Sequence, residues 1–366
     1  MNNNLDVLIL FSTSTLGGAE RSLSRMALAS SEVRYRLSSI QGEGPWSDWI
    51  SSLGEEPILF GRNSLWDFSL FVPVVKLILY LRSNPDSILY LCGGARLTFI
   101  VSLLRFLYTG TTIIQGVRWN PSSNSNLDRV FRFILRYLHR SVDGWISNSK
   151  AAKDTLVQRC GIDKRNIYVI YNGIDTVPEY SSNFDVRPLE VLTVANLNPR
   201  KGHREFLHVI HKVVQRVPDV RFVFIGRDDM NGAVQQAVTE AGLDAYVRYE
   251  GFQSDVTPWF KRARLFVLPS LWNEGSPTSI LEAFSFAVPV IAHAIDGVPE
   301  LVDDGSDGYL VLPMDKAFPD RIVELLLDPV RAESMGQIGR NKVADHFLLS
   351  RCIRQHEAVF KRLVNK

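Results

Sequence analysis

The sequence predicts an α/β protein with two Rossmann-like domains, each built on a doubly wound parallel sheet. Short apolar, β-rich runs alternate with helical patterns through the first half of the chain, which is typical of a parallel sheet. The alternation restarts at Leu189, after the segment SSNFDVRP at 181–188, which has the composition of a linker. At 366 residues, the chain also exceeds one ordinary core. We therefore expect domains at 1–180 and 189–346 that face each other across a cleft.

In the first half, the apolar run Asp6–Phe11 is typical of a strand that is buried on both faces of a parallel sheet. It leads through Gly17 and Gly18 into a helical pattern from Arg21 to about Ala29. Further strands are predicted at Arg36–Ile40, Pro57–Leu59, Ile88–Cys92, Thr112–Gly116 and Gly144–Ile146, and the helices between them at Trp46–Leu53, Phe68–Arg82, Arg96–Tyr108, Leu127–Arg140 and Lys150–Arg159.

The glycine turn at Gly17 and Gly18 is a candidate anion site, because glycines after a strand let the backbone approach a ligand closely. The turn does not match the dinucleotide fingerprint G-x-G-x-x-G, which argues against a nicotinamide dehydrogenase. The alternative is a tight strand-to-helix turn without a ligand. Arg118 follows another predicted strand, and the carboxyl ends of parallel strands are where such sheets bind ligands.

The second half contains two glutamates on either side of a predicted helix start. Ser276 is a favourable N-cap residue and Pro277 a favourable first helical residue, so Glu274 precedes the helix and Glu282 lies in its second turn. The unpaired N–H groups of the helix start attract phosphates. Two carboxylates that bind hydroxyls beside such a helix end suit a sugar nucleotide. The surrounding strands are predicted at Leu189–Ala195, Val220–Gly226, Val247–Tyr249, Leu265–Pro269 and Val288–Ala292.

Composition excludes several other classes of protein. The net charge of +2 is too small to indicate nucleic acid as the main partner. The three cysteines are widely spaced and form neither a metal-binding pattern nor a disulfide framework, so we expect a reducing cytosol. No apolar run is long enough to span a bilayer, and the N-terminus lacks the basic start of a signal peptide.

Four arginines lie at spacings of three and four residues in one predicted helix, which places them in one stripe: Arg129, Arg132, Arg136 and Arg140. Aromatic and aliphatic residues fill most of the rest of this helix. A basic, aromatic-rich amphipathic helix can lie on an anionic membrane surface. The alternative is a solvated arginine face over an ordinary buried face.

An ordered set of motifs resembles the retaining glycosyltransferases of family 4, which have the GT-B fold. The resemblance covers nearly the whole chain and includes the glycine turn with Ala19-Glu20, VIYNGID at 169–175, VANLNPRKG at 194–202, Gly251-Phe252, FVLPS at 266–270, and the E-x7-E motif from Glu274 to Glu282. It implies that the last helix, at 347–366, crosses back onto the first domain.

The resemblance also implies roles for individual residues in binding a nucleotide-diphosphate sugar. Lys201 stands at the position of the family's diphosphate-binding lysine, Glu274 would contact the donor sugar and Glu282 the ribose. Thr278 and Ser279 would offer backbone N–H groups to the phosphates. The remaining donor-binding candidates are Gly17, Gly18, Asn196, Arg200, Gly251, Phe252, Ser276 and Pro277.

The chain departs from the family pattern at several of these positions. Asn196 replaces an arginine that the family commonly has, so one expected diphosphate cation is missing, and Arg200 is the candidate substitute. The first domain lacks the family histidine, and Arg118 is the candidate in its place. Ala287 and Asp296 stand where glycines are usual.

These observations predict a cytoplasmic, retaining glycosyltransferase of the hexosyltransferase kind, with Glu274, Lys201 and Arg118 as its catalytic candidates. Its acceptor would be a hydroxyl of a glycan or lipid-linked oligosaccharide, as in the synthesis of cell-surface polysaccharides. No metal or other cofactor is expected, because the chain has no Asp-x-Asp motif and cations and helix ends can stabilise the diphosphate. The alternatives are a nucleotide-sugar epimerase on the same fold and a catalytically silent nucleotide-sugar-binding module.

Overall fold

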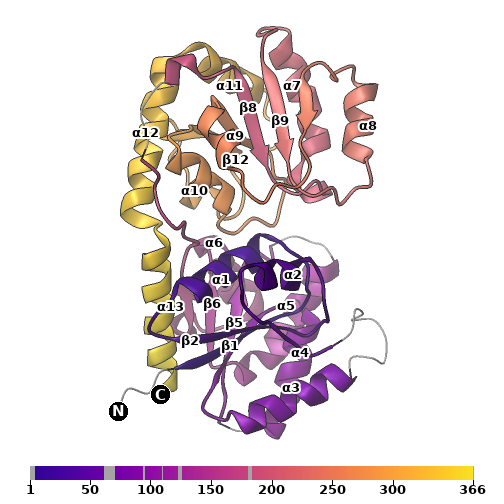
Figure 1. The fold of residues 1–366 in the computed structure, drawn as a ribbon, viewed down its shortest axis with the longest axis vertical. Helices are drawn as coiled ribbons and strands as arrows, with labels where there is room; N and C mark the ends of the chain where they lie inside the picture. Colours follow the sequence, from indigo (N-terminus) through magenta and orange to yellow (C-terminus); the bar gives the residue numbers. More distant parts are fainter. Residues whose placement is uncertain are drawn as a thin grey trace. The chain divides into compact units, whose positions relative to one another are not determined.

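The computed structural model describes residues 5–61, 71–93, 95–108, 110–122, 126–179 and 184–365. The chain forms two compact units, one of residues 1–172 with 349–366 and the other of residues 173–348 (Figure 1). Each unit contains one sheet with every described pair of neighbouring strands parallel. This arrangement confirms the predicted α/β class with two doubly wound parallel sheets.

The sheet of the first unit has seven strands in the order β3-β2-β1-β4-β5-β6-β7. The strands are β1 (Asp6–Phe11), β2 (Arg34–Ser39), β3 (Ile58–Leu59), β4 (Ile88–Cys92), β5 (Thr112–Val117), β6 (Gly144–Ser147) and β7 (Ile167–Val169). The α-helices of this unit are α1 (Gly18–Ala29), α2 (Pro45–Ser52), α3 (Phe71–Ser83), α4 (Ala95–Leu103), α5 (Asn126–Leu138), α6 (Lys150–Cys160) and α13 (Leu349–Val364).

The sheet of the second unit has six strands in the order β10-β9-β8-β11-β12-β13. These strands are β8 (Glu190–Val194), β9 (Arg221–Ile225), β10 (Val247–Tyr249), β11 (Leu265–Leu268), β12 (Val290–His293) and β13 (Gly308–Val311). The α-helices are α7 (His203–Val214), α8 (Ala233–Glu240), α9 (Thr257–Arg262), α10 (Thr278–Ser285), α11 (Phe318–Leu327) and α12 (Pro329–His346).

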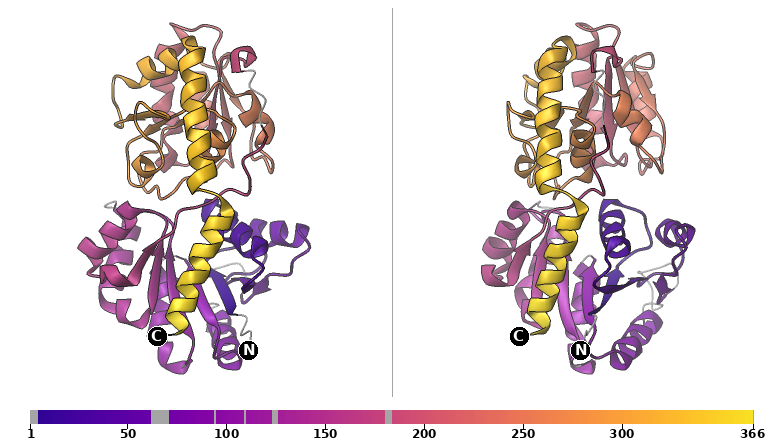
Figure 2. Two further views of the ribbon diagram at one scale, coloured as in Figure 1. Left: turned by 90° about the vertical axis from the view of Figure 1, so that its left-hand side faces the viewer. Right: turned by 60° about the vertical axis from the view of Figure 1, so that its left-hand side comes forward.

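Helices cover both faces of the first sheet. Apolar side chains of α1, α2 and α13 pack on one face, and those of α3, α4, α5 and α6 pack on the other. In Figure 2, α13 lies at the yellow end of the colour scale, against the sheet of the first unit. The last helix thus belongs to the first unit although its sequence follows the second.

The chain enters the second unit before the expected linker at 181–188, of which residues 181–183 lie outside the described part. Residues 173–179 already belong with the second unit, because Arg340 of α12 donates a hydrogen bond to the Pro178 carbonyl at 2.7 Å and Ile174 forms a parallel bridge with Leu348. The helix predicted at Phe68–Arg82 is described from residue 71 onward, and its predicted first residues, 68–70, lie outside the described part.

No helix in the described ranges combines the length and the apolar character that crossing a bilayer requires.

Candidate active site

The most deeply buried ion pair with a predicted site residue joins Lys201 and Glu274. Lys201 ends a 3₁₀ turn, η6 (Pro199–Lys201), that follows β8, and Glu274 lies between β11 and α10. The Lys201 Nζ donates to Glu274 Oε1, and the two side chains are 12% and 6% exposed. Because β8 and β11 are neighbours in a parallel sheet, their carboxyl ends meet at one edge. The sheet order therefore brings together two residues that are 73 positions apart.

Close contacts join the backbone of the η6 turn to the segment after β11. The Arg200 carbonyl accepts a hydrogen bond from Leu271 N at 2.7 Å, and Arg200 Nη1 donates to the Asn273 carbonyl at 3.1 Å. Gly202 has a φ of +70°, and a Cβ there would lie 2.2 Å from the Pro269 carbonyl oxygen. Only glycine fits this close approach without displacing the turn that carries Lys201.

The electrostatics of the pair favour its ionised form. Burial raises the pKa of the Glu274 carboxyl, but the charges of Lys201 and Arg200 outweigh burial and hold that pKa below its usual range. Burial lowers the pKa of the Lys201 ammonium, and Glu274 offsets part of this effect. A buried carboxylate and ammonium of opposite charge stabilise each other, whereas either one alone would be strongly disfavoured.

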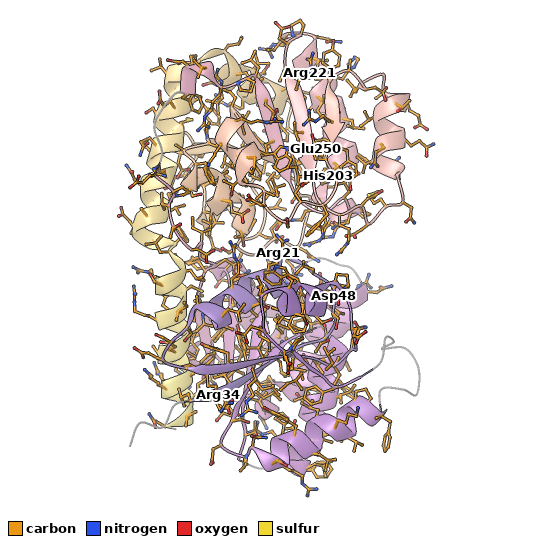
Figure 3. The ribbon with its side chains drawn as sticks, in the orientation of Figure 1. Arg21, Arg34, Asp48, His203, Arg221 and Glu250 are labelled. Atoms are coloured by element: carbon orange, nitrogen blue, oxygen red, sulfur yellow. The ribbon has the colours of Figure 1, made fainter. Side chains whose placement is uncertain are left out.

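His203 is a buried, neutral neighbour of this pair. It opens α7, is 2% exposed, and meets the ring of Phe224 edge-on with the centroids 5.1 Å apart. Burial, with a smaller contribution from Lys201, lowers the pKa of His203 to about 3, so the ring carries no charge near neutral pH. Within the described part of the chain, neither ring nitrogen has a hydrogen-bond partner. His203 is labelled in Figure 3.

Asp296 contacts Glu274 in a way that the sequence did not predict. Its carboxylate Oδ2 accepts a hydrogen bond from the Glu274 backbone N at 3.0 Å. Asp296 itself has a φ of 47°, in the left-handed region that normally favours glycine. The same is true of Ala287, at φ 51°. These are the two positions where the family usually has glycine, and the backbone conformation gives the physical reason for that preference.

The helix α10 begins at Thr278, one residue later than predicted. Pro277 is its N-cap, with φ −64° and ψ 113°, and the Pro277 side chain makes no capping hydrogen bond. The predicted N-cap, Ser276, lies one residue earlier and is buried. Glu282 is in the second turn and half-buried. The backbone amides of Thr278 and Ser279 thus lie in the first turn of a helix that starts four residues after Glu274.

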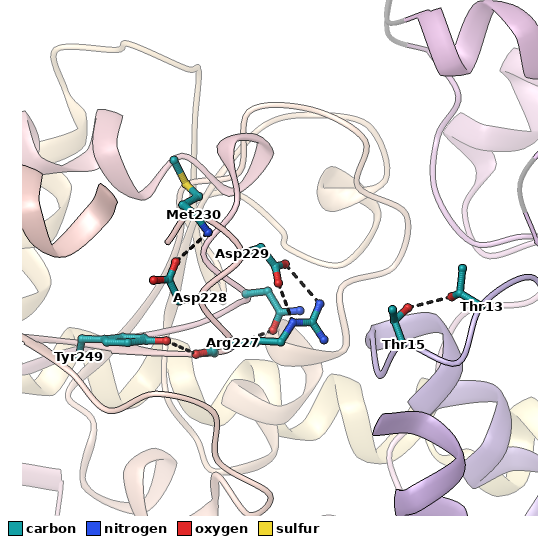
Figure 4. Close-up of polar contacts among 9 residues, drawn as sticks. Thr13, Thr15, Arg227, Asp228, Asp229, Met230 and Tyr249 are labelled. Atoms are coloured by element: carbon teal, nitrogen blue, oxygen red, sulfur yellow. Dashed lines mark hydrogen bonds and ion pairs between the residues drawn. The ribbon is translucent and has the colours of Figure 1, made fainter. Parts of the chain in front are cut away.

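The predicted donor-binding residue Asn196 follows β8, and Gly251 and Phe252 follow β10, with β9 between these two strands in the sheet. Asn196 Oδ1 accepts a hydrogen bond from Arg227 N at 3.1 Å, so the asparagine fixes the backbone after β9. The Gly251 carbonyl accepts from Gly226 N at 2.9 Å, and Phe252 is half-exposed. Arg227 is a cation that the sequence analysis missed, and it pairs with Asp229 at 2.6 Å (Figure 4).

The adjacent acids Asp228 and Asp229 have local partners. Asp228 accepts hydrogen bonds from Met230 N at 2.8 Å and Gly232 N at 2.6 Å, and Asp229 pairs with Arg227 (Figure 4). Among the residues that the structure describes, no group of three or more histidine, cysteine, aspartate or glutamate side chains is placed to hold a metal ion.

The predicted residues of the first unit follow strands β1 and β5. Gly17 is the N-cap of α1, and a Cβ there would lie 2.7 Å from the Glu20 carboxylate, while Gly18 borders open space. Arg118 follows β5 and is only 8% exposed. Its Nη2 donates to Ser22 Oγ at 3.1 Å and to Asn172 Oδ1. Arg118 therefore joins α1 to the last residue of the first unit's main segment.

Two family models match the chain. One, described as glycosyltransferase family 4, matches residues 16–177, and the other, described as glycosyl transferases group 1, matches residues 188–328. Among curated relatives, the chain is 26% identical over 270 residues to UDP-Gal:alpha-D-GlcNAc-diphosphoundecaprenol alpha-1,3-galactosyltransferase of Escherichia coli, and the alignment spans 69% of each chain. It is 29% identical over 247 residues to phosphatidyl-myo-inositol mannosyltransferase of Mycobacterium tuberculosis, over 63% of each chain.

Solved structures show the same fold along nearly the whole chain. HepE of Anabaena in complex with UDP superposes with a TM-score of 0.81 at 20% identity, covering 98% of this chain and 100% of HepE. Sucrose-phosphate synthase from Thermosynechococcus elongatus superposes with a TM-score of 0.78 at 17% identity, covering 98% of this chain and 99% of the synthase. The chain therefore belongs to the glycosyltransferases of the family 4 type and has the GT-B fold.

Proposed function

We propose that this protein transfers a sugar, with retention of anomeric configuration and without a metal, from a nucleotide-diphosphate sugar to a hydroxyl of a lipid-linked or growing glycan. The observation that carries this proposal is the buried Lys201–Glu274 pair beside the start of α10. A cation, a carboxylate and the start of a helix meet there, and each matches one part of such a donor.

The donor's diphosphate becomes more negative as its bond to the sugar breaks, so the site must stabilise that charge. Lys201 and Arg200 supply cations, and the first-turn amides at Thr278 and Ser279 supply N–H donors at the positive end of the helix dipole. In this assignment Glu274 accepts hydrogen bonds from the hydroxyls of the donor sugar. Glu282, in the second turn, accepts hydrogen bonds from the ribose hydroxyls.

The balanced reaction requires no separate base from the protein. The bond between the anomeric carbon and the phosphate oxygen breaks, and a bond from the acceptor oxygen forms on the same face. The acceptor's proton passes to the leaving phosphate oxygen, and a nucleoside diphosphate is released. This route is compatible with a first domain that lacks the family histidine, because the leaving group itself accepts the proton.

Metal independence is inferred from the residues that are available to bind the diphosphate. The chain lacks an Asp-x-Asp motif, and its adjacent acids at Asp228 and Asp229 already have local partners. Lys201 and Arg200 can neutralise the diphosphate in place of a divalent ion. The nature of the acceptor is supported by the names of relatives, one of which refers to a diphosphoundecaprenol-linked sugar and another to phosphatidyl-myo-inositol. We therefore also propose that the enzyme acts at the cytoplasmic side of a membrane that contains its lipid-linked acceptor.

The test begins with a panel of nucleotide sugars in a thermal stabilisation assay, because a bound donor raises the melting temperature by mass action. The stabilising donor is then incubated with lipid-linked acceptors, and the anomeric configuration of the product is determined by NMR. We expect a retained configuration and full activity in EDTA. Inversion, or loss of activity in EDTA with rescue by magnesium, would overturn the corresponding part of the proposal.

The same experiment separates the two alternative functions. An epimerase would convert the donor in the absence of any acceptor. A silent binding module would be stabilised by nucleotide diphosphate but would transfer nothing, and replacing Glu274 would leave its product formation unchanged at zero. Transfer that depends on both the acceptor and Glu274 would exclude both.

A further inference from the structure

The solvent-facing side of α5 is more apolar than the arginine stripe predicts. Phe133 and Tyr137 are 65% and 66% exposed, and their ring centroids are 4.8 Å apart. Val130 is also exposed, and around the helix these three side chains fall within about 60° of one another. Phe131 and Leu135 occupy the opposite, buried side. The helix therefore already buries one apolar side in the core and carries a second one outward.

The arginines flank this outward apolar side. Arg129 and Arg136 are exposed and lie next to it around the helix, and Arg140 is exposed just beyond the end of α5. Arg132 is half-buried and donates to the Pro121 carbonyl, so it contributes to the fold as well. Three of the four arginines in the predicted stripe are thus exposed, and the fourth is half-buried.

The neighbouring helix adds further exposed apolar groups. Helix α4 contacts α5, and both pack on the same face of the first sheet (Figure 1). Phe99 and Leu103 of α4 are exposed, and Phe106, in the 3₁₀ turn η2 (Arg105–Leu107), is 72% exposed. We call the outer side of α4, η2 and α5 the α4–α5 surface; its exposed apolar side chains are Phe99, Leu103, Phe106, Val130, Phe133 and Tyr137.

Charge is concentrated in the same part of the chain. Between residues 71 and 141 the sequence has nine lysines and arginines against two aspartates and glutamates, whereas the rest has 32 against 37. The near-neutral total therefore conceals a basic segment within an otherwise acidic protein. Six exposed apolar side chains on adjoining helices indicate an interaction site, and the arginines beside them favour an anionic partner.

We infer that the α4–α5 surface binds an anionic lipid bilayer in its interfacial region. Phe133, Tyr137 and Phe106 would insert among the headgroups and upper acyl chains, where aromatic rings are favourable, while Arg129 and Arg136 pair with lipid phosphates. Each arginine near an anionic surface strengthens binding by about fivefold. The inference deepens the proposed function and rests on it for its purpose, since it brings the enzyme to the surface that contains a lipid-linked acceptor.

The test is co-sedimentation of the full-length protein with vesicles of pure phosphatidylcholine and of phosphatidylcholine mixed with phosphatidylglycerol. One variant, Phe133→Ser/Tyr137→Ser, removes aromatic rings, and another, Arg129→Gln/Arg136→Gln, removes charge. The matched control for charge is Arg351→Gln/Arg354→Gln, on exposed positions of α13, which packs on the opposite face of the same sheet. The control for exposed apolar groups is Leu327→Ser/Val330→Ser in the second unit.

We expect the wild type to bind the anionic vesicles and to be partly released by high salt. The aromatic variant should bind at least tenfold more weakly and be released completely by salt. The arginine variant should lose most of its preference for phosphatidylglycerol, and both control variants should bind as the wild type does. Absence of wild-type binding, equal binding to neutral and anionic vesicles, or an equal loss in the controls would overturn the inference.

Thermal stabilisation by the nucleotide-sugar donor distinguishes failure of the membrane inference from failure of the proposed function. All four variants leave the Lys201–Glu274 region untouched, so the donor should raise their melting temperatures as it does for the wild type. Weak vesicle binding with intact stabilisation by the donor would count against the membrane surface alone. Normal vesicle binding without any response to nucleotide sugars would count against the proposed transfer.

Discussion

Replacing Lys201 with methionine should reveal whether the pair with Glu274 is as buried and as ionised as its geometry indicates. Methionine keeps much of the side-chain volume but removes the ammonium, so the Glu274 carboxylate remains buried without its main partner. Removing one member of a buried ion pair typically costs 3–5 kcal/mol, roughly. Arg200 also lowers the pKa of Glu274, which favours the lower end of this range, about 3 kcal/mol.

For a unit of this size, a loss of about 3 kcal/mol lowers the melting temperature by about 6–12 °C. The double variant Lys201→Met/Glu274→Gln removes the buried charge as well and should recover at least half of the loss. Lys212→Met, at an exposed position of α7, is the matched control and should change stability by no more than about 0.5 kcal/mol.

The pH dependence of the free energy of unfolding is an independent test of the ionised pair. In the wild type the pKa of Glu274 is depressed, so its contribution to stability is present above the unfolded-state pKa and is lost as the pH falls through the folded-state value. In Lys201→Met, burial dominates and should raise the pKa of Glu274, so protonation relieves the destabilisation. The stability gap between variant and wild type should therefore narrow as the pH falls from about 7 to about 5.

Urea unfolding across this pH range measures the gap, and thermal shift with the donor measures binding. The variant should also lose stabilisation by the donor and transfer activity. A gap that is absent, or that stays constant with pH, would refute the assignment of a buried, ionised pair. Wild-type transfer rates in a folded variant would remove Lys201 from the active site.

Three further predictions concern the same site. Gly202→Ala should destabilise the second unit by roughly 3 kcal/mol or more and abolish stabilisation by the donor, because its Cβ meets the Pro269 carbonyl; Gly242→Ala, with φ +67° and open space around it, should cost only about 1 kcal/mol in urea unfolding. Asp296→Gly should relieve backbone strain yet raise the KM for the donor, since it frees the Glu274 backbone N–H; unchanged steady-state kinetics would contradict this. Transfer assayed in excess EDTA should proceed at the untreated rate, and a divalent-ion requirement would exclude the metal-free mechanism.

The strands of the sheet interiors could be predicted because burial on both faces imposes continuous apolar runs. Ile88–Cys92 is a strand with the predicted bounds, and each of its five residues is buried. The edge strand β7, at Ile167–Val169, was not predicted as a strand. Only one of its three residues is buried, so its sequence has no comparable apolar run. β7 is a strand because it pairs with β6, and a local sequence pattern does not encode that pairing.

The position of Lys201 beside Glu274 was predictable from topology, because both follow strands whose carboxyl ends meet at one sheet edge. The contact from Asp296 was not, because it depends on a left-handed backbone that an aspartate adopts only with support from its surroundings. Which aromatic residues of α5 point outward could not be predicted from the sequence, for a different reason. Aromatic residues at helical spacing usually indicate a core-facing side, and α5 has such a side in Phe131 and Leu135 as well.

Two of the positions where this chain departs from its family, Ala287 and Asp296, are also positions where its backbone is strained. A non-glycine residue in the left-handed region costs about 1–2 kcal/mol, so Ala287 and Asp296 both reduce stability where glycine would not. The methyl side chain of Ala287 offers no hydrogen bond in return. A Cβ on Gly336 of α12 would lie 2.1 Å from the Ala287 carbonyl oxygen, so α12 packs closely against this turn. Asp296 gains the hydrogen bond from the Glu274 backbone. Strain at Asp296 thus coincides with added support for the carboxylate that we assign to the donor sugar, which is the pattern expected of a site held in position before its substrate binds.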